Sequence, residues 1–395
     1  MAGRKRGTVH DLRRDNRSVL LNALYFGGER SRQDLSAATG LSQASVSNVM
    51  RELLDDGIVM EVGSVGSDGG RPRVLLRVNP DYGYVIGVDV GETRVRVELF
   101  DLAMTERAKA DYPLDPRRHD ATAVVSRILS GIDAVLGESG IQPGSILGVG
   151  VGVPGVVQQQ PDVLVDAQTF GWRDVPLERL LRAGTDLPLQ VDNGANTMGQ
   201  AELWFGSGRG AQNAIVGLIG SGVGAAIITH GSTDRDSPAS AGEWGHTPVI
   251  VGGRSCRCGN IGCLEAYVGA ESMLQRYEEA GGTLVSGDQE TALAALLLAA
   301  ATPDTLEQRI VDETVLYLGA SLGGLINLLN PERIILGGWA GLLLGEHYLP
   351  ALRETARRHS LTHPFATTTI ELGQLGPDAV ALGAATLPLE RFLNG

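Results

Sequence analysis

The spacing of apolar residues predicts three short helices near the start of the chain. Apolar positions recur at helical intervals over residues 16–26, and this pattern stops at Gly27. Ser31 and Ser42 stand where helix N-caps are expected before two further patterns, and Asp34 lies at capping-box spacing from Ser31. The third pattern has one inward-facing apolar stripe, made of Val46, Val49, Met50 and Leu53. Three helices with a tight turn before the third are typical of a helix-turn-helix.

Two segments rich in β-forming residues follow the third helix, at 58–62 and 74–78. The glycine-rich segment between them carries Arg71 and Arg73, so the pattern predicts a hairpin with a long basic tip. Three helices followed by a hairpin have the order of a winged helix-turn-helix. The segment that comes next has turn composition and predicts a linker, so we expect a DNA-binding domain over residues 1–80.

From residue 84 the chain alternates between apolar strands and helical patterns. Strands are predicted at 85–89, 94–100, 146–153, 187–191, 214–219, 225–229, 333–336 and 368–372. Helices are predicted at about 121–137, 195–205, 263–279, 288–302, 306–329, 345–359 and 378–391. Strands that alternate with helices predict an α/β architecture, so we expect a second domain over residues 84–395.

The formal net charge of the chain is −13, which by itself argues against binding to the phosphates of nucleic acid. This charge is distributed unevenly along the sequence. Residues 1–80 contain 12 Lys and Arg against 9 Asp and Glu, whereas residues 81–395 contain 21 against 37. The N-terminal part is therefore the part suited to DNA, and the remainder is expected to bind a different partner.

The hydrophobic segments are too short to predict a membrane span. The longest apolar run, Ala292–Ala301, has about half the residues that a transmembrane helix needs and is interpreted as a buried helix. The basic residues Arg4, Lys5 and Arg6 are not followed by the apolar stretch of a secretory signal. We therefore expect a cytoplasmic protein that has no membrane partner.

All three cysteines of the chain lie within eight residues, at Cys256, Cys258 and Cys263. Clustered cysteines in a cytosolic protein favour a metal over a disulfide, and His246 lies ten residues upstream as a fourth candidate ligand. Thiolates and an imidazole suit tetrahedral Zn²⁺, and four protein ligands leave no open position for a zinc-dependent hydrolase. The spacing predicts a structural zinc ion on a loop over residues 246–263. The alternative is a chance cluster of buried cysteines.

Two carboxylates flank the cysteine cluster. Glu243 lies three residues before His246, and Glu265 lies two residues beyond the last cysteine. A loop that is stiffened by a metal and carries two carboxylates is suited to bind neighbouring hydroxyls of a sugar through charge-assisted hydrogen bonds. The alternative for two such residues is a solvated surface.

The segment Ala241–His246, followed by Cys256–Glu265 with its C-x-C-G-x-x-G-C-x-E spacing, resembles the signature of the ROK family of sugar-responsive repressors and sugar kinases. The resemblance extends over about residues 84–390, and the N-terminal winged helix is similar to that of the family's repressors. It implies a two-lobed actin-like domain of the ribonuclease H-like, sugar-kinase superfamily, with a sugar in the cleft. It also implies zinc on His246, Cys256, Cys258 and Cys263, and sugar contacts from Glu243, His246 and Glu265.

Three further segments bear on the kinase branch of this family. The kinases' phosphate-binding pattern Asp-x-Gly-Gly-Thr-Lys is matched by residues 89–94, but Glu92 stands in place of a glycine. A carboxylate is poorly suited to a phosphate cradle of bare N–H groups. The loop at 220–224 is closer to a phosphate loop, although a tight hairpin has the same composition. Between these two segments, the kinases carry an Asn-Asp pair whose Asp is the general base; Asn193 is kept, but the Asp falls on Gly194.

Glycine cannot act as a general base. Asp192 is a poor substitute, because adjacent side chains of an extended segment point apart. The alternative function, an ATP-dependent sugar kinase of this family, is therefore disfavoured. Asn193 is expected to contact the sugar from the side of the cleft opposite Glu243, His246 and Glu265.

The third helix offers polar side chains for base edges or phosphates in the major groove, and the hairpin tip offers arginines for the minor groove or for phosphates. The candidate DNA contacts are Gln43, Ser45, Ser47, Asn48, Arg51, Arg71 and Arg73. The alternative is a solvated helix face. One winged helix covers a half-site, so we expect a homodimer or higher homo-oligomer on an inverted-repeat operator. The sequence thus predicts a repressor of carbohydrate-utilisation genes, without enzyme activity, whose DNA affinity responds to a small sugar.

Overall fold

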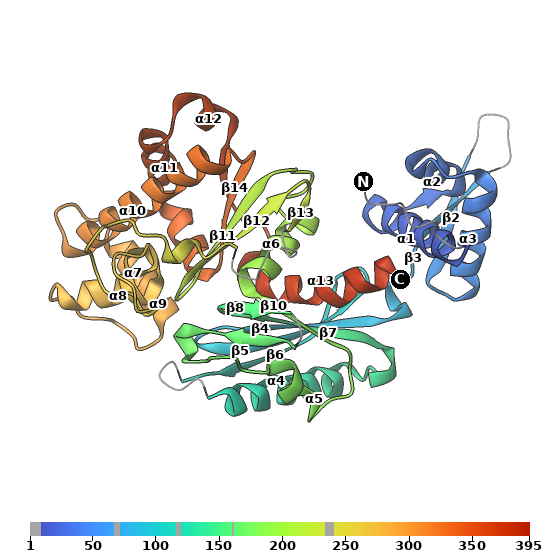
Figure 1. Ribbon diagram of the computed structural model, residues 1–395, viewed down its shortest axis with the longest axis horizontal. Coiled ribbons are helices and arrows are strands. Elements are labelled where there is room, and N and C mark those ends of the chain that lie inside the picture. The colour runs from blue at the N-terminus through green and yellow to red at the C-terminus, as the bar shows by residue number, and fades with distance from the viewer. Residues whose placement is uncertain (1–8, 67–71, 116–119, 160–161, 234–240) are drawn as a thin grey trace, which may run out of the picture.

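The computed structural model describes residues 9–66, 72–115, 120–159, 162–233 and 241–395, which form three parts (Figure 1). An N-terminal unit holds the first three helices and a small sheet. Two larger lobes follow, each built on a five-stranded sheet. The helix α13 (Ala379–Asn394) runs along the first lobe, and its C-terminal end lies beside the N-terminal unit. Strands and helices alternate in both lobes, which confirms the predicted α/β class.

The N-terminal unit contains its elements in the predicted order. Its helices are α1 (Val9–Gly27), α2 (Arg32–Thr39) and α3 (Gln43–Asp55). Its sheet has the order β1 (Arg30–Ser31), β3 (Arg73–Val78), β2 (Val59–Val65). Ser31 and Asp34 form the predicted capping box, and the apolar stripe of α3 is buried. α1 begins earlier than predicted, because its first turns are polar and carry no apolar periodicity.

The first lobe is built on a sheet with the order β10, β7, β4, β5, β6. These strands are β4 (Tyr84–Val90), β5 (Arg94–Asp101), β6 (Glu106–Pro113), β7 (Ile146–Val153) and β10 (Leu189–Asn193). One face is covered by α4 (Ala121–Ser139) and α5 (Leu177–Arg182), and the strands β8 (Val156–Gln158) and β9 (Leu164–Asp166) form a small ribbon after β7. The sequence did not predict β6, an edge strand in which four of eight residues are charged.

The second lobe repeats this topology with the order β13, β12, β11, β14, β15. Its strands are β11 (Ala214–Ile219), β12 (Val223–Thr229), β13 (Ser232–Thr233), β14 (Arg333–Gly337) and β15 (Thr369–Leu372). In both lobes the first strand pairs with the second in antiparallel and with the fourth in parallel. Numbered by chain order within each five-stranded sheet, both sheets read 3-2-1-4-5. Two lobes of one topology are what the predicted actin-like fold requires.

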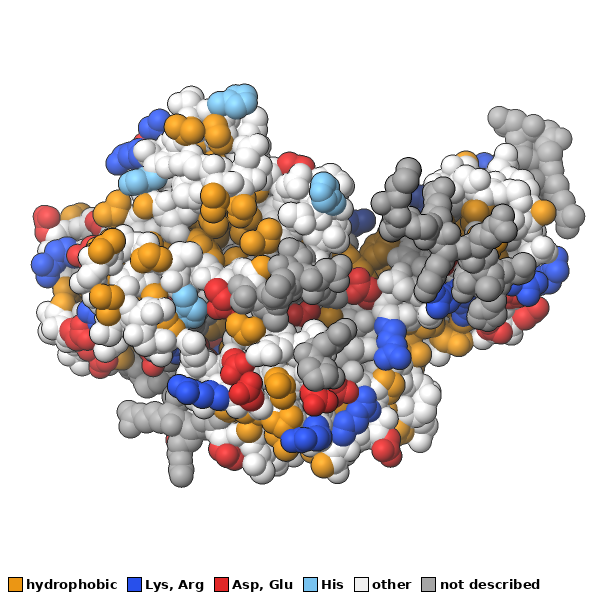
Figure 2. Space-filling view, in the orientation of Figure 1, with side chains coloured by type: hydrophobic (Ala, Val, Ile, Leu, Met, Phe, Trp, Pro, Cys, Tyr) orange, Lys and Arg blue, Asp and Glu red, His pale blue; other side chains and the backbone are white. Residues whose placement is uncertain are grey.

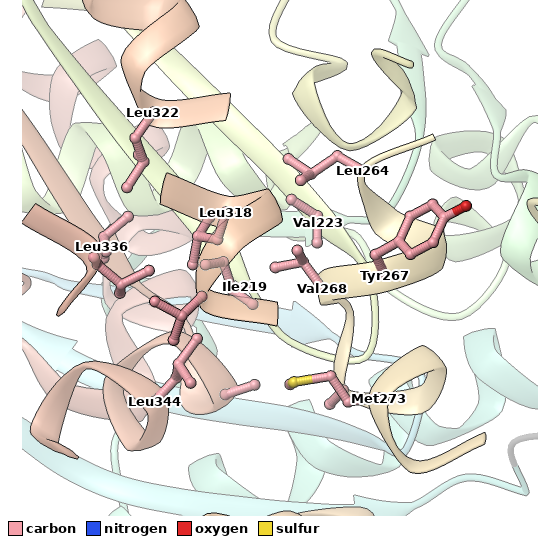
Figure 3. Close-up of a cluster of buried hydrophobic side chains, with 14 of the residues drawn as sticks. Ile219, Val223, Leu264, Tyr267, Val268, Met273, Leu318, Leu322, Leu336 and Leu344 are labelled. Atoms are coloured by element: carbon pink, nitrogen blue, oxygen red, sulfur yellow. The ribbon is translucent and has the colours of Figure 1, made fainter. Parts of the chain in front are cut away.

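The second lobe carries most of the helices. They are α7 (Glu265–Val268), α8 (Ala270–Glu279), α9 (Gln289–Ala299), α10 (Leu306–Leu329), α11 (Trp339–His359) and α12 (Thr362–Thr367). The helix predicted at 263–279 is interrupted at Gly269, and the helix predicted at 345–359 begins at Trp339. Figure 3 shows how leucines of α10 and side chains around α7 meet those of the sheet in one core.

The helices α6 (Gly194–Phe205) and α13 pack against each other on the sheet face opposite α4. Gly87 of β4 and Gly150 of β7 allow α13 to approach closely. A Cβ atom at Gly87 would lie 1.9 Å from the carbonyl oxygen of Ala381, and a Cβ atom at Gly150 would lie 1.8 Å from that of Ala384. Any larger residue would therefore push α13 away from the sheet.

One apolar cluster joins the N-terminal unit to the first lobe. It combines buried leucines of α1 and the apolar stripe of α3 with Phe100 and Leu102 of the first lobe and with Leu389 and Leu393 of α13. The N-terminal unit is therefore held to the body of the protein by shared core residues as well as by the chain. Among the helices of the described ranges, none combines the length and the apolar character needed to cross a membrane.

Candidate functional site

A cavity of about 480 Å³ lies between the two lobes and is called the cleft below. The carboxyl ends of β4, β7 and β10 open into it from the first lobe, and the turn between β11 and β12 faces them from the second. Ligands of open α/β sheets bind at the carboxyl ends of strands. Acidic side chains lie along the border between the lobes on the face shown in Figure 2. The cleft is therefore the candidate ligand site.

The four predicted metal ligands come together beside the cleft, on residues 246–263, called the metal loop below. One ligand atom each of His246, Cys256, Cys258 and Cys263 lies within 4.8 Å of the others. Sγ of Cys258 is 3.7 Å from Sγ of Cys263, and Sγ of Cys256 is 3.7 Å from Nδ1 of His246. Two sulfurs bound at about 2.3 Å to one tetrahedral zinc ion are about 3.8 Å apart, so this donor set fits zinc.

The metal loop is anchored in the core of the second lobe. Cys256 and Cys263 belong to the same apolar cluster as Leu264 and Tyr267, which Figure 3 shows against the leucines of α10. Burial raises the pKa of the Cys256 thiol to about 12. Cys258, in contrast, lines the cleft. The cluster thus lies at the boundary between the core and the ligand site, where it can fix the shape of the cleft wall.

His246 faces both the cysteines and the cleft. Its Nδ1 points to Cys256, and its Nε2 lies 3.8 Å from Oε2 of Glu243. Glu243 also lines the cleft, and burial raises the pKa of its carboxyl group. One imidazole can therefore hold a metal through Nδ1 and face a cleft ligand through Nε2, which fits both roles expected of His246.

Glu265 stands at the start of α7, lines the cleft and is 3% exposed. Its Oε2 accepts a hydrogen bond from the N–H of Val223 at 2.9 Å, and its Oε1 lies 3.3 Å from the guanidinium of Arg257. The backbone of β12 and the metal loop thus fix this carboxylate in one orientation. A pre-oriented carboxylate is suited to accept hydrogen bonds from ligand hydroxyls.

Asn193 ends β10 and caps α6 from the other side of the cleft. Its Oδ1 accepts hydrogen bonds from the N–H groups of Ala195 and Asn196, and its Nδ2 donates to the carbonyl of Gly155 at 2.7 Å. The side chain lines the cleft, but both of its polar ends already hold the protein together. Asn193 therefore positions the loop that faces a ligand, in addition to any contact of its own.

Gly194 also lines the cleft, and space does not demand a glycine there. A Cβ atom at this position would lie 3.6 Å from its nearest neighbours, Val153 and Val380, which is an ordinary contact. Asp192 does not line the cavity, and its Oδ1 accepts a hydrogen bond from the N–H of Asn193 at 2.7 Å. The cleft therefore has no carboxylate at the position where the sequence analysis placed a kinase base.

Three cleft residues could not be predicted from the sequence: Asp166 at the end of β9, and Gln168 and Thr169 directly after it. Oγ1 of Thr169 is buried and has no hydrogen-bond partner among the described residues. A hydroxyl with unused hydrogen-bonding capacity in a cleft wall is a candidate ligand contact. No motif in this segment points to a ligand, so only the packing of β9 beside the cleft reveals it.

Asp89 is half-buried at the carboxyl end of β4, where it lines the cleft. Burial raises the pKa of this carboxyl group to about 7, although the nearby Arg96 and Arg94 oppose the rise. The negative charges of Glu98 on β5 and Asp111 on β6 raise this pKa further. Asp89 thus changes its charge near neutral pH, inside the candidate ligand site.

The candidate DNA contacts lie on the outer part of the N-terminal unit. Gln43, Asn48 and Arg51 of α3 are exposed, whereas Ser45 and Ser47 are half-buried. Ser45 also takes part in the cap of α3, since its N–H donates to Oγ of Ser42 at 3.2 Å. From the hairpin, Arg73 lies 3.4 Å from Asp34 of α2. Arg71 lies outside the described residues.

A sequence profile of the ROK family matches residues 85–391. The chain belongs to the ROK family. The xylose repressor of Caldicellulosiruptor bescii is 30% identical over 391 residues, and the match covers 97% of each chain. A solved ROK family transcriptional regulator, described as a homolog of the E. coli MLC protein, has a TM-score of 0.80 at 23% identity and also covers 97% of each chain.

A ROK family glucokinase from Streptomyces griseus, solved with glucose and AMPPNP, has a TM-score of 0.67 at 26% identity. This match covers 78% of our chain and all of the glucokinase. The predicted ROK resemblance and the predicted two-lobed fold are thus confirmed. The matches to the xylose repressor and to the solved transcriptional regulator also cover the N-terminal unit, because each extends over 97% of the chain.

Proposed function

We propose that this ROK protein is a transcriptional repressor of carbohydrate-utilisation genes, which binds DNA through its N-terminal unit and a small sugar in its cleft. The observation that carries the proposal is the extent of the similarity. The xylose repressor matches 97% of the chain, N-terminal unit included, whereas the glucokinase matches 78%. A helix-turn-helix unit with an exposed polar helix face is suited to DNA binding.

In this proposal the N-terminal unit is a winged helix-turn-helix with α3 as its recognition helix. The exposed side chains Gln43, Asn48 and Arg51 reach base edges or phosphates. The hydroxyl groups of the half-buried Ser45 and Ser47 form hydrogen bonds where α3 approaches the DNA most closely. Arg71 and Arg73 of the hairpin contact the neighbouring backbone or minor groove. Two such units on an inverted repeat supply the specificity that one lacks, so we propose a homodimer that acts on DNA in the cytoplasm.

The sugar is proposed to bind between Asn193 on the first lobe and Glu243, His246 and Glu265 on the second. The two carboxylates accept hydrogen bonds from vicinal hydroxyls, and the fixed orientation of Glu265 favours one stereochemistry of the ring. The unpartnered hydroxyl of Thr169 adds a further contact from the first lobe. A ligand held from both sides favours one arrangement of the lobes over others.

The metal loop is proposed to hold one structural zinc ion on His246, Cys256, Cys258 and Cys263. When bound, the ion supplies positive charge that stabilises thiolates and a fixed geometry for the loop. Glu265 follows the last ligand and His246 is itself a ligand, so the shape of the sugar site depends on this loop. The protein's own residues do the rest: they bind and orient the sugar.

We further propose that the protein is not an enzyme. The kinase alternative requires a general base near the attacking sugar hydroxyl, and the cleft has glycine at the expected position. A repressor needs the sugar to be bound and released unchanged. Closure of the cleft around the sugar is then the signal that alters DNA affinity.

A DNA titration tests the proposal. Duplexes are first selected from a random-sequence pool, and D-xylose, D-glucose and other monosaccharides are screened by thermal shift. Fluorescence anisotropy then measures the affinity for the selected duplex with and without the stabilising sugar, at one salt concentration. We expect the sugar to change the affinity by about 5- to 150-fold. Arg51→Ala should weaken DNA binding and leave the thermal shift unchanged.

Glu243→Ala should abolish the response to sugar and leave sugar-free DNA binding intact. Glu354→Ala is the matched control, because Glu354 is a carboxylate on α11 that does not line the cleft and pairs with Arg357 and Arg358. Equal DNA affinities with and without the sugar that stabilises the protein would contradict the proposed signal.

A further inference from the structure

Two turns face each other at one end of the cleft, residues 91–93 between β4 and β5 and residues 220–222 between β11 and β12. Both contain glycine, and turns of this kind present bare backbone N–H groups to phosphates. Arg94 and Arg96 line the cavity near them, and Arg257 reaches it from the metal loop. Such a set of groups is typical of an anion site, but the partners of the arginines change its character.

Arg257 makes a bidentate ion pair across the cleft. Its Nη1 and Nη2 donate to Oε2 and Oε1 of Glu92 at 2.5 and 3.1 Å. Glu92 belongs to the first lobe and Arg257 to the second. The same guanidinium lies 3.3 Å from Glu265 and 2.8 Å from Glu271, both in the second lobe. The side chains of Glu92 and Arg257 are 14% and 29% exposed, so the pair is partly shielded from water. Its two parallel charge-assisted hydrogen bonds fix the geometry of the pair.

The ion pair lies over the turn of the second lobe. A Cβ atom at Gly222 would be 3.1 Å from Nη2 of Arg257 and 3.3 Å from Oε1 of Glu92. Glu92 is itself a residue of the turn of the first lobe. The Glu92–Arg257 pair therefore fills the space between the two turns, where a phosphate chain held by both turns has to lie.

The other two arginines are also neutralised. Arg94 lies 2.9 Å from Glu290 of α9, which is a second contact between the lobes. Arg96 lies 3.1 Å from Asp111 and pairs with Asp378 as well. Within the described part of the chain, every arginine at this end of the cleft thus has a carboxylate partner. A phosphate that enters this end of the cleft must therefore compete with a carboxylate for each of these three arginines.

We propose that the Glu92–Arg257 pair takes the place of nucleotide phosphates between the two turns and makes the cleft reject nucleotides. The inference deepens the proposed function and rests on it in one respect, because it leaves the sugar as the ligand of the cleft. It assigns Arg257 and Glu92 as residues that determine ligand specificity, a role that the metal-loop position of Arg257 alone does not suggest.

The two halves of the pair have opposite effects on a nucleotide. A triphosphate enters only by separating the pair, which leaves the carboxylate of Glu92 beside phosphate oxygens of like charge. Without Glu92, Arg257 stays in place through Glu265 and Glu271, and the positions on Nη1 and Nη2 that Glu92 occupied become available to the phosphates. Without Arg257, Glu92 repels them. If the pair had only a structural role, loss of Glu92 and loss of Arg257 would have the same effect on nucleotide affinity.

Calorimetric titration with Mg²⁺ and a non-hydrolysable ATP analogue tests this asymmetry without sugar or DNA. Glu92→Gly is expected to bind the analogue at least about tenfold more tightly than the wild type, which corresponds to about 1.4 kcal/mol. Arg257→Gln is expected to show no gain, and adding it to Glu92→Gly should remove the gain. Glu271→Gln is the matched control: it removes a carboxylate from the same guanidinium, but one that does not cross the cleft.

Zinc content and melting temperature are measured for every variant, and Glu92→Gln, which keeps the side chain's length, replaces Glu92→Gly if that variant fails to fold. A wild type that binds the analogue as tightly as the Glu92 variants would overturn the proposal. An equal gain from Arg257→Gln, or from Glu271→Gln, would overturn it too. None of these outcomes depends on DNA binding, so a failure here is distinct from a failure of the proposed repressor function.

Discussion

Asp89 shows how one residue can link the cleft to the stability of the protein. The pKa of its carboxyl group is raised to about 7 by burial, whereas an unfolded chain has the ordinary value near 3.8. Between these values the folded protein holds a proton that the unfolded chain has lost. Folding is therefore favoured by this group at low pH, and its contribution falls as pH rises from about 4 to about 7. Above about 7 the folded protein carries the full cost of the buried charge.

Asp89→Asn is expected to remove this dependence, because an amide stays neutral across the range. The difference in melting temperature, variant minus wild type, should be more positive at pH 8 than at pH 5. Thermal melts in matched salt at the two pH values measure it, with Asp133→Asn on the exposed face of α4 as the control. A variant whose difference is the same at both pH values would show that Asp89 keeps an ordinary pKa in the folded protein.

At the scale of elements, local chemistry was readable from the sequence and spatial pairing was not. The caps at Ser31 and Ser42 and the cysteine spacing are short-range signals, and the structure has the caps and brings the cysteines together. β6 escaped prediction because a charged edge strand shows no apolar alternation. The pair formed by Glu92 and Arg257 joins residues 165 positions apart, and no periodicity encodes such a contact.

The metal loop is the element whose integrity is easiest to test. Backbone hydrogen bonds already close its two ends, since the N–H of Leu264 donates to the carbonyl of Thr247 at 2.9 Å, and one ligand atom of each of the four proposed ligands lies within 4.8 Å of the others. We expect about one equivalent of zinc in protein purified without chelator. Cys258→Ser should lower zinc content, melting temperature and the sugar-induced thermal shift together, because Glu265 lies two residues after the last ligand of the loop. Elemental analysis and thermal melts measure these changes.

Ser255→Ala is the control for the loop, since Ser255 is exposed and lies beside Cys256 without a ligand atom in the cluster. It should keep the zinc and the thermal shift of the wild type. Protein that is free of metal and still folds and binds sugar normally would contradict a structural role for zinc.

In the whole molecule, the helices α6 and α13 connect the cleft to the N-terminal unit. Figure 1 shows α13 along the first lobe, with its C-terminal end beside that unit. Gly194 at the start of α6 and Val380 at the start of α13 line the cleft. At their other ends, Trp204 of α6 packs edge-on against Phe26 of α1 with ring centroids 4.9 Å apart, and Asn22 of α1 donates to the carbonyl of Leu393 at 3.3 Å. A change in the cleft can therefore reach the N-terminal unit through two helices.

Phe26→Ala is expected to weaken the coupling between sugar and DNA more than it weakens either binding reaction. Phe26 does not line the cleft and is not among the candidate DNA contacts, but it joins α1 to α6. The ratio of DNA affinities with and without sugar should fall toward one, and the effect of DNA on sugar affinity should fall by the same factor, since linkage is reciprocal. Val19→Ala is the control, because Val19 is an exposed residue of the same helix, 46% accessible.

Anisotropy titrations of DNA at fixed salt measure the effect of sugar on DNA affinity, and sugar titrations with and without DNA measure the reciprocal effect. If the Phe26 variant keeps the wild-type ratio while Trp204→Ala does as well, the signal does not pass through the contact of α1 with α6, and the route along α13 to Asn22 becomes the one to break.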